Sequence, residues 1–272
     1  MIGPDAGRYL IAGQGRPVVR PFHLRWLAPR LCHDDMRRWW ALWGASWVVA
    51  ALGAFWWGHG EGLDASHAAA LAVMLLALPG VLGPAGSHPV GADLPSLALS
   101  LVAAGAFSAG WWPIAIVALI VATGFKETAP PVVALWCWSP LPLVGLVVVV
   151  LTALIRHPGM DPVTAQNPVL RHVHDHPIRS AMEHHRGRWR DAWLMVAPWG
   201  VTLAALLDPS PALIVALIIA YAQLLVATDS VRLYQPVAGP LMALGAVTVI
   251  PDRWLLLAVV VHVVWWRRPE VV

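Results

Sequence analysis

Long apolar runs separated by shorter polar stretches dominate this chain. Several runs approach the roughly 20 consecutive apolar residues that a helix needs to cross the hydrocarbon core of a bilayer, and others are shorter. The pattern predicts an all-α fold, a polytopic transmembrane helical bundle with about nine apolar segments (eight to ten), in which short segments are tilted, broken or re-entrant. The segments lie near residues 39–57, 66–83, 94–111, 112–125, 131–155, 192–207, 210–228, 237–250 and 252–266.

Two polar regions interrupt this pattern. Residues 1–38 carry seven arginines and three aspartates, and residues 156–191 carry six arginines, four acids and six histidines. We therefore expect four parts, which are a basic, partly interfacial N-terminal segment (1–38), a first half of the bundle (39–155), a polar loop rich in His and Arg (156–191) and a second half of the bundle (192–272).

The composition agrees with a membrane protein. Hydrophobic residues make up 58% of the chain and charged residues 12%, whereas a soluble domain is about one quarter charged. The mean hydropathy is +0.65. Two cysteines, Cys32 and Cys137, are too few for a disulfide framework. We expect an integral protein of a bacterial cell membrane that contacts membrane lipid and does not bind nucleic acid, because its arginines lie beside the apolar segments.

The direction of the segments depends on the stretch 131–155. With nine crossings, Lys and Arg divide equally between the two sides, nine against nine. If residues 131–155 cross twice, with a break at Ser139-Pro140, the division becomes 17 against one. Charge favours the second arrangement, with both termini in the cytoplasm. Length favours the first, since 25 residues make one comfortable span.

Ionisable residues near the segment ends are the candidates for chemistry. Lys126 and Glu127 stand between two apolar runs, where they form either an interfacial turn or a pair that faces a polar cavity. Asp93 precedes a segment, either as a helix N-cap or as a site residue. Asp229 and Arg232 follow another segment and form either a surface ion pair or part of the same site.

The N-terminal segment has its own motif. Asp5 opens a stretch that contains Tyr9, and Pro-Phe-x-x-Arg-x-Leu-x-Pro follows at residues 21–29, with Arg25 at its centre. A basic, aromatic segment of this kind can lie on anionic lipid. It can also contribute to a binding site.

Taken in order, these motifs resemble the GT-C glycosyltransferase superfamily, in particular poorly characterised bacterial members with Arg-Glu-Thr where this chain has Lys-Glu-Thr. The resemblance covers roughly residues 5–240 as scattered short motifs. It implies a transferase that uses a polyprenyl-phosphate-linked sugar as donor, with an extracytoplasmic active site. In the family a span precedes the acidic loop, whereas four residues precede Asp5 here, so a degenerate relative is a further expectation.

The resemblance also implies roles for individual residues. Asp5 is the catalytic candidate, as a general base or as a carboxylate that assists a divalent metal ion. Lysine and arginine suit a lipid phosphate, and a carboxylate suits an acceptor hydroxyl. The candidate substrate-binding residues are Arg25, Asp93, Lys126, Glu127, Asp229 and Arg232.

Two other functions remain open. Intramembrane charges and segments broken by proline fit a transporter, although no inverted repeat is visible. A non-enzymatic membrane scaffold would use residues 156–191 as a docking surface. The histidines of that region, including His172, His174 and His176, are expected in a solvated loop and not in a metal site.

Overall fold

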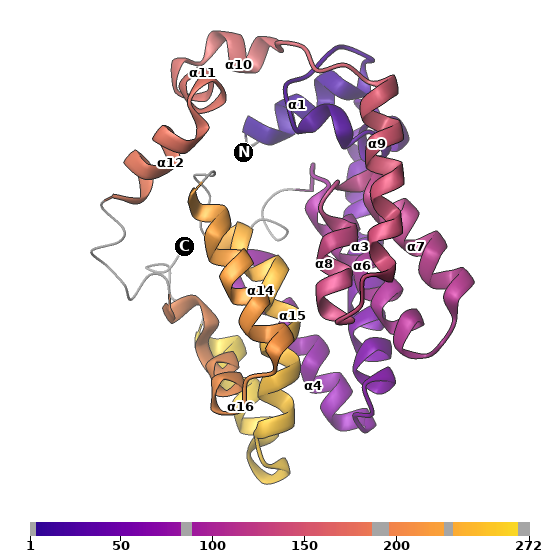
Figure 1. Ribbon diagram of the computed structural model, residues 1–272, viewed down its shortest axis with the longest axis vertical. Coiled ribbons are helices and arrows are strands. Elements are labelled where there is room, and N and C mark those ends of the chain that lie inside the picture. The colour runs from indigo at the N-terminus through magenta and orange to yellow at the C-terminus, as the bar shows by residue number, and fades with distance from the viewer. Residues whose placement is uncertain (1–3, 83–88, 187–195, 226–230, 266–272) are drawn as a thin grey trace. The chain divides into compact units, whose positions relative to one another are not determined.

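The computed structural model describes residues 4–82, 89–186, 196–225 and 231–265. Within these ranges the chain forms helices joined by turns, with no strand (Figure 1). It divides into two compact units, each made from two stretches of sequence. Unit 1 comprises Met1–Gly53 and Ala85–His174, and unit 2 comprises Ala54–Pro84 and Asp175–Val272. The predicted all-α class is confirmed.

Both units are assembled mainly from short helices, and the long helix α3 is divided between them. Unit 1 contains α1 (Pro4–Gly13), η1 (Phe22–Leu24), α2 (Leu27–Cys32), most of α3 (Met36–Gly60), α6 (Asp93–Ser108), α7 (Trp112–Phe125), α8 (Ala129–Trp136), η2 (Leu141–Gly145), α9 (Leu146–Ile155), α10 (Pro162–Gln166) and nearly all of α11 (Pro168–Asp175). Unit 2 contains the end of α3, α4 (Ala65–Leu76), α12 (Pro177–His185), η4 (Ala197–Leu207), α14 (Pro211–Ala222), η5 (Gln223–Leu225), α15 (Val231–Val249) and α16 (Asp252–Trp265).

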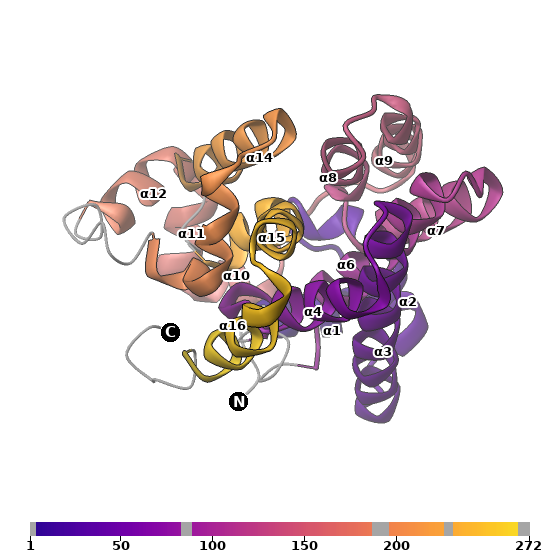
Figure 2. The same ribbon diagram turned by 90° about the horizontal axis from the view of Figure 1, so that it is seen from below.

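Helix α6 lies at the centre of unit 1 and packs against α7 and α8 (Figure 2). Its alanines allow close approach of the neighbouring helices, and Ala103, Ala104 and Ala106 are completely buried. A Cβ atom added at Gly53 of α3 would lie 3.0 Å from the backbone nitrogen of Val102. The small residues therefore set the spacing between the helices that hold the functional residues.

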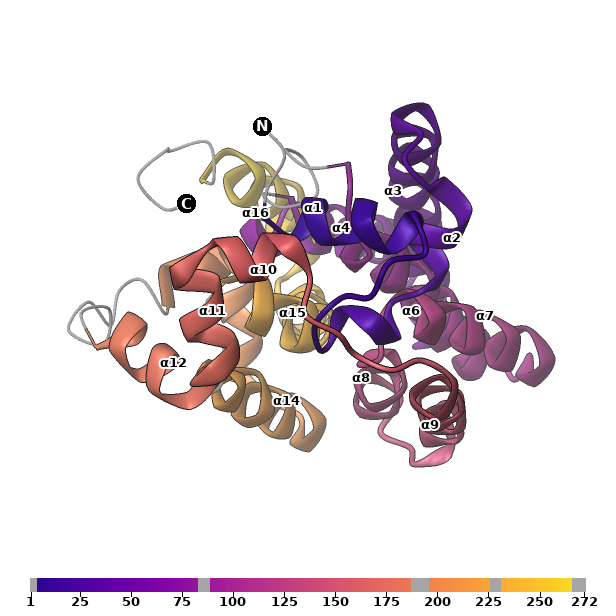
Figure 3. The same cartoon turned by 90° about the horizontal axis from the view of Figure 1, so that it is seen from above.

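The apolar stretch 131–155 forms a helical hairpin. Helix α8 ends at Trp136, Trp138 has a positive φ of 47°, and the chain then turns back through η2 into α9. Helices α8 and α9 lie side by side in the views of Figures 1 and 3. A Cβ atom at Gly145 would lie 2.8 Å from Pro130 Cγ, so the two arms are in close contact. The chain thus reverses its direction within this stretch.

Unit 2 has a buried polar link within its apolar core. The Gln235 side chain is completely buried in α15, where Nε2 donates a hydrogen bond to the Pro198 carbonyl at 2.6 Å and Oε1 accepts one from the Gly80 amide. Pro236 and Pro240 lie inside the same helix and remove backbone donors from it. Gln235 therefore ties α15 to two backbone segments at the point where its own hydrogen bonding is weakened.

Apolar side chains are exposed on several helices. Helix α9 has no buried residue, and Leu154 and Ile155 are 69% and 78% exposed. On α7, Val117 is 61% exposed, and on α16, Leu256 is 76% exposed. In the described part of the chain, α3 is the one helix long and apolar enough to cross a membrane, and the shorter apolar helices have 10–17 residues. The polytopic bundle of about nine segments therefore stays a prediction.

The secondary structure of the polar region 156–191 differs from prediction. We expected a solvated loop, but residues 162–185 form the three short helices α10, α11 and α12. Each begins with a proline, which suits the first position of a helix. Asp161 caps α10 through the Thr164 amide at 2.8 Å, and the Asn167 side chain accepts hydrogen bonds from the amides of Val169 and Leu170 in α11.

Candidate functional site

Unit 1 brings six charged side chains and one tyrosine into a single network, which we call the charged cluster. Helix α1 supplies three of them, the segment after η1 one, the start of α6 one, and the turn between α7 and α8 two. Ion pairs, hydrogen bonds and electrostatic interactions link its members. The charged cluster comprises Asp5, Arg8, Tyr9, Arg25, Asp93, Lys126 and Glu127.

The Arg25–Glu127 ion pair is the centre of the charged cluster. Nε and Nη2 of Arg25 each donate to one carboxylate oxygen of Glu127, both at 3.0 Å, and the two side chains are 11% and 16% exposed. Such bidentate pairing is the strongest geometry for an arginine and a carboxylate. Burial alone would raise the pKa of Glu127, but the charge and hydrogen bonds of Arg25 hold it below its ordinary value.

Tyr9 connects this pair to the other carboxylates. Arg25 Nη1 donates a hydrogen bond to the Tyr9 hydroxyl at 3.3 Å. Burial raises the pKa of Tyr9 to about 12, and the negative charges of Asp93 and Asp5 also act to raise it. Burial opposes the charge on Arg25, yet Tyr9 and Glu127 keep the pKa of Arg25 well above its ordinary value. Arg25 therefore remains charged at any physiological pH.

Lys126 and Asp93 form a second ion pair at the edge of the charged cluster. Lys126 Nζ lies 2.7 Å from Asp93 Oδ1, and the two side chains are 18% and 22% exposed. The pair joins the residue after α7 to the first residue of α6. The N-cap of α6 is Ala92, so the interpretation of Asp93 as a cap is wrong.

Arg8 links the charged cluster to the segment before α10. It lies 3.2 Å from Asp5 Oδ1 and donates two hydrogen bonds to Thr164 Oγ1, at 3.2 and 3.0 Å. Thr164 in turn donates to Asp161, whose completely buried carboxylate lies 3.9 Å from Arg8 and accepts from the Val19 amide. The guanidinium carbons of Arg8 and Arg25 lie 4.8 and 5.1 Å from the centre of the Phe22 ring.

Five of the seven predicted site residues meet in the charged cluster: Asp5, Arg25, Asp93, Lys126 and Glu127. The two others are not placed with them. Asp229 lies outside the described residues, and Arg232 belongs to α15 of unit 2, where its side chain is not described.

Sequence reasoning missed Arg8, Asp161 and Thr164. Arg8 follows Asp5 by three residues in a helix, a spacing that predicts an ion pair. Asp161-Pro162 is a typical start of a helix, with an aspartate as N-cap and a proline at the first position. Both signals were available in the sequence, but neither reveals that the two segments meet.

The described residues do not form a metal site. No group of three or more His, Cys, Asp or Glu side chains within them is arranged to hold a metal ion. The carboxylates of Asp5, Asp93 and Glu127 are instead engaged by Arg8, Lys126 and Arg25. These carboxylates do not fit a divalent cation as they stand.

Comparisons with protein-family models, with curated proteins and with solved structures find no match to this chain. The geometry of the charged cluster is therefore the basis for any functional proposal.

Proposed function

We propose that this chain is a polytopic membrane protein that transfers a sugar from a polyprenyl-phosphate donor, with the charged cluster as its reaction site. The observation that supports the proposal most is the convergence of residues that are far apart in sequence. Arg25 and Glu127, for example, are 102 residues apart and form a bidentate pair. Ionisable residues are costly among apolar helices, and their assembly in one place is typical of a functional site.

The exposed apolar helices support the membrane part of this proposal. A soluble protein rarely leaves large contiguous apolar surfaces in water. The exposed apolar side chains of α7, α9 and α16 are suited to contact with lipid chains. A lipid-linked donor would reach a site beside such helices by diffusion within the bilayer.

In this proposal Asp5 is the general base. It is the most exposed carboxylate of the charged cluster, with 27% of its side chain accessible. Its carboxylate takes the proton of the acceptor hydroxyl while the hydroxyl oxygen forms a bond to the anomeric carbon of the sugar. The bond from that carbon to the phosphate oxygen breaks, and polyprenyl phosphate leaves with the electron pair. Lys126 leaves its ion-pair partner Asp93 and contacts the departing phosphate instead. Its positive charge stabilises the negative charge that develops on that phosphate.

The test is release of polyprenyl phosphate from radiolabelled polyprenyl-phosphate mannose and polyprenyl-phosphate glucose by the purified full chain. Asp5→Asn should lower the rate by about a hundredfold or more, since general-base catalysis contributes at least that factor. Asp34→Asn is the matched control, because Asp34 is an exposed acid of the same N-terminal segment. Equal rates for Asp5→Asn and the wild type would show that Asp5 is not the base.

A membrane scaffold is the second candidate, and two observations favour it. The three cations of the charged cluster are matched by three carboxylates, which suits a structural clamp. Residues 1–38, which carry seven arginines, also contact the segments around Glu127 and Gly159. In the membrane placement proposed here, this basic segment would lie on the same side of the membrane as Lys126 and Arg156. Concentrated positive charge predicts the cytoplasmic side, whereas the transferase requires the outer side.

A further inference from the structure

A second group of positively charged residues surrounds η1. Arg20, Arg156 and His157 lie close enough to His23 to lower its pKa, after the larger effect of burial. Burial and the nearby charge of Arg30 likewise lower the pKa of Arg156. Within the described part of the chain, Arg20, Arg30 and Arg156 form no ion pair with a carboxylate. We call these three arginines the cationic group.

The cationic group lies where the apolar hairpin returns to the N-terminal segment. Helix α9 contacts η1, and its C-cap is Arg156. Beyond it, the Gly159 amide donates a hydrogen bond to the Val18 carbonyl at 3.0 Å, where the two segments cross (Figure 3). An apolar helix surface without buried residues therefore ends directly at a set of arginines. An apolar surface followed by arginines matches the order of hydrocarbon chains and phosphate headgroups in a lipid layer.

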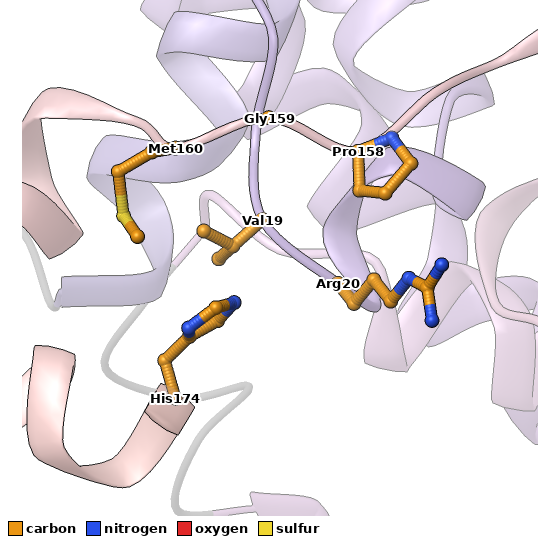
Figure 4. Close-up of a pocket in the computed structure, with 6 residues that line it drawn as sticks. All are labelled: Val19, Arg20, Pro158, Gly159, Met160 and His174. Carbon is orange, nitrogen blue, oxygen red and sulfur yellow. The ribbon is translucent and has the colours of Figure 1, made fainter.

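An open depression of about 380 Å³ lies beside the cationic group. Figure 4 shows Arg20 and Pro158 on one side of it, and His174 pointing toward Val19 on the other. The nearby His23 is 8% exposed, and its Nδ1 has no hydrogen-bond partner. Glu127 is also close to His23, but both of its oxygens accept from Arg25. The charge near η1 is thus unbalanced, in contrast to that of the charged cluster.

We propose that the cationic group binds the phosphate of a membrane lipid whose hydrocarbon chains lie along α9. Three arginines without carboxylate partners suit a phosphate, which offers several acceptor oxygens. The apolar surface of α9 distinguishes a lipid from a soluble phosphate as the ligand, because it would cover the chains. The inference rests on the membrane placement proposed above, but not on sugar transfer at the charged cluster.

The experiment measures binding of phosphatidylglycerol and of a polyprenyl phosphate to the purified full chain in a neutral detergent. The double variant Arg20→Gln/Arg156→Gln should bind its lipid roughly thirtyfold more weakly, because each basic residue near the headgroup contributes about a factor of five. Arg179→Gln is the control, since Arg179 is exposed and paired with Glu183 on α12. Arg20→Lys/Arg156→Lys keeps the charge and should retain most of the binding, which separates lost charge from misfolding.

Two results would overturn the inference. One is equal affinity of the double glutamine variant and Arg179→Gln for both lipids. The other is full competition by inorganic phosphate, which would show a site for soluble anions. The stronger-binding lipid identifies the natural class of ligand. If the wild-type chain bound neither lipid but still transferred sugar, this inference alone would be refuted, and the Asp5→Asn experiment tests the transferase separately.

Discussion

At the scale of single residues, the Arg25–Glu127 pair determines how the N-terminal segment is held against the turn after α7. Both side chains are mostly buried, so removal of one partner leaves a charge in a poorly hydrated place. The resemblance carried by the order of the motifs predicted that both residues belong to one site. It did not indicate that they contact each other, because nothing in either motif specifies a partner 102 residues away.

Glu127→Gln should destabilise the protein by about 3 kcal/mol, since it leaves Arg25 without its counter-charge. The measurement is the free energy of unfolding in neutral detergent. Glu183→Gln is the control, because it breaks an ion pair whose side chains are 74% and 53% exposed and should cost less than about 1 kcal/mol. Equal stability of the two variants would contradict the central role of the Arg25–Glu127 pair.

His23 should make the protein sensitive to mild acid. Burial and the nearby arginines lower its pKa in the folded protein below the ordinary value of 6.5. The unfolded chain therefore binds a proton more readily, and stability that is present above pH 6.5 is lost as the pH falls through the folded pKa. His23→Leu should show a smaller fall in unfolding temperature over this range than the wild type. Identical pH profiles would show that folding does not change the pKa of His23.

At the scale of elements, the hairpin of α8 and α9 decides which residues meet. The sequence showed both the apolar stretch 131–155 and its break at Ser139-Pro140, and it left one crossing and two crossings open. The structure shows a reversal at Trp138. Helix α8 has eight residues and is about 12 Å long, less than half the hydrocarbon thickness of a bilayer. In the membrane placement proposed above, a re-entrant hairpin therefore fits its length better than two full spans. Hydrophobicity alone cannot give this result, because both arms are apolar.

Gly145→Ala tests the hairpin. The new methyl group would lie 2.8 Å from Pro130 Cγ, and a proline ring has little freedom to move, so we expect a loss of about 1–3 kcal/mol in unfolding free energy. Gly44→Ala in α3 is the control, because a Cβ atom there meets nothing within 4 Å, and it should be neutral or slightly stabilising. A neutral Gly145→Ala would mean that the two arms of the hairpin are not in contact.

At the scale of the whole molecule, the two proposed functions differ in the side of a membrane that would carry the charged cluster. The contacts of Arg8 with Thr164 and of Arg25 with Glu127 hold the N-terminal segment, the turn after α7 and the start of α10 together, so all three would lie on one side of a membrane. The charge distribution in the sequence alone favours the cytoplasm for this side, and the resemblance implies the exterior. Composition cannot decide between them, because the positive-inside rule describes how a chain inserts and not what its site does.

Membrane sidedness is the decisive measurement. Single cysteines replace the exposed residues Gln14, Thr128 and Met160 in a background that lacks Cys32 and Cys137, and intact cells are treated with an impermeant thiol reagent. A cysteine at Gly60, at the other end of α3, is the control for the opposite side. The proposed transferase predicts labelling of the first three from outside and protection of Gly60→Cys. Labelling of Gly60→Cys alone, with the other three reached only after lysis, would contradict a transferase and leave the scaffold.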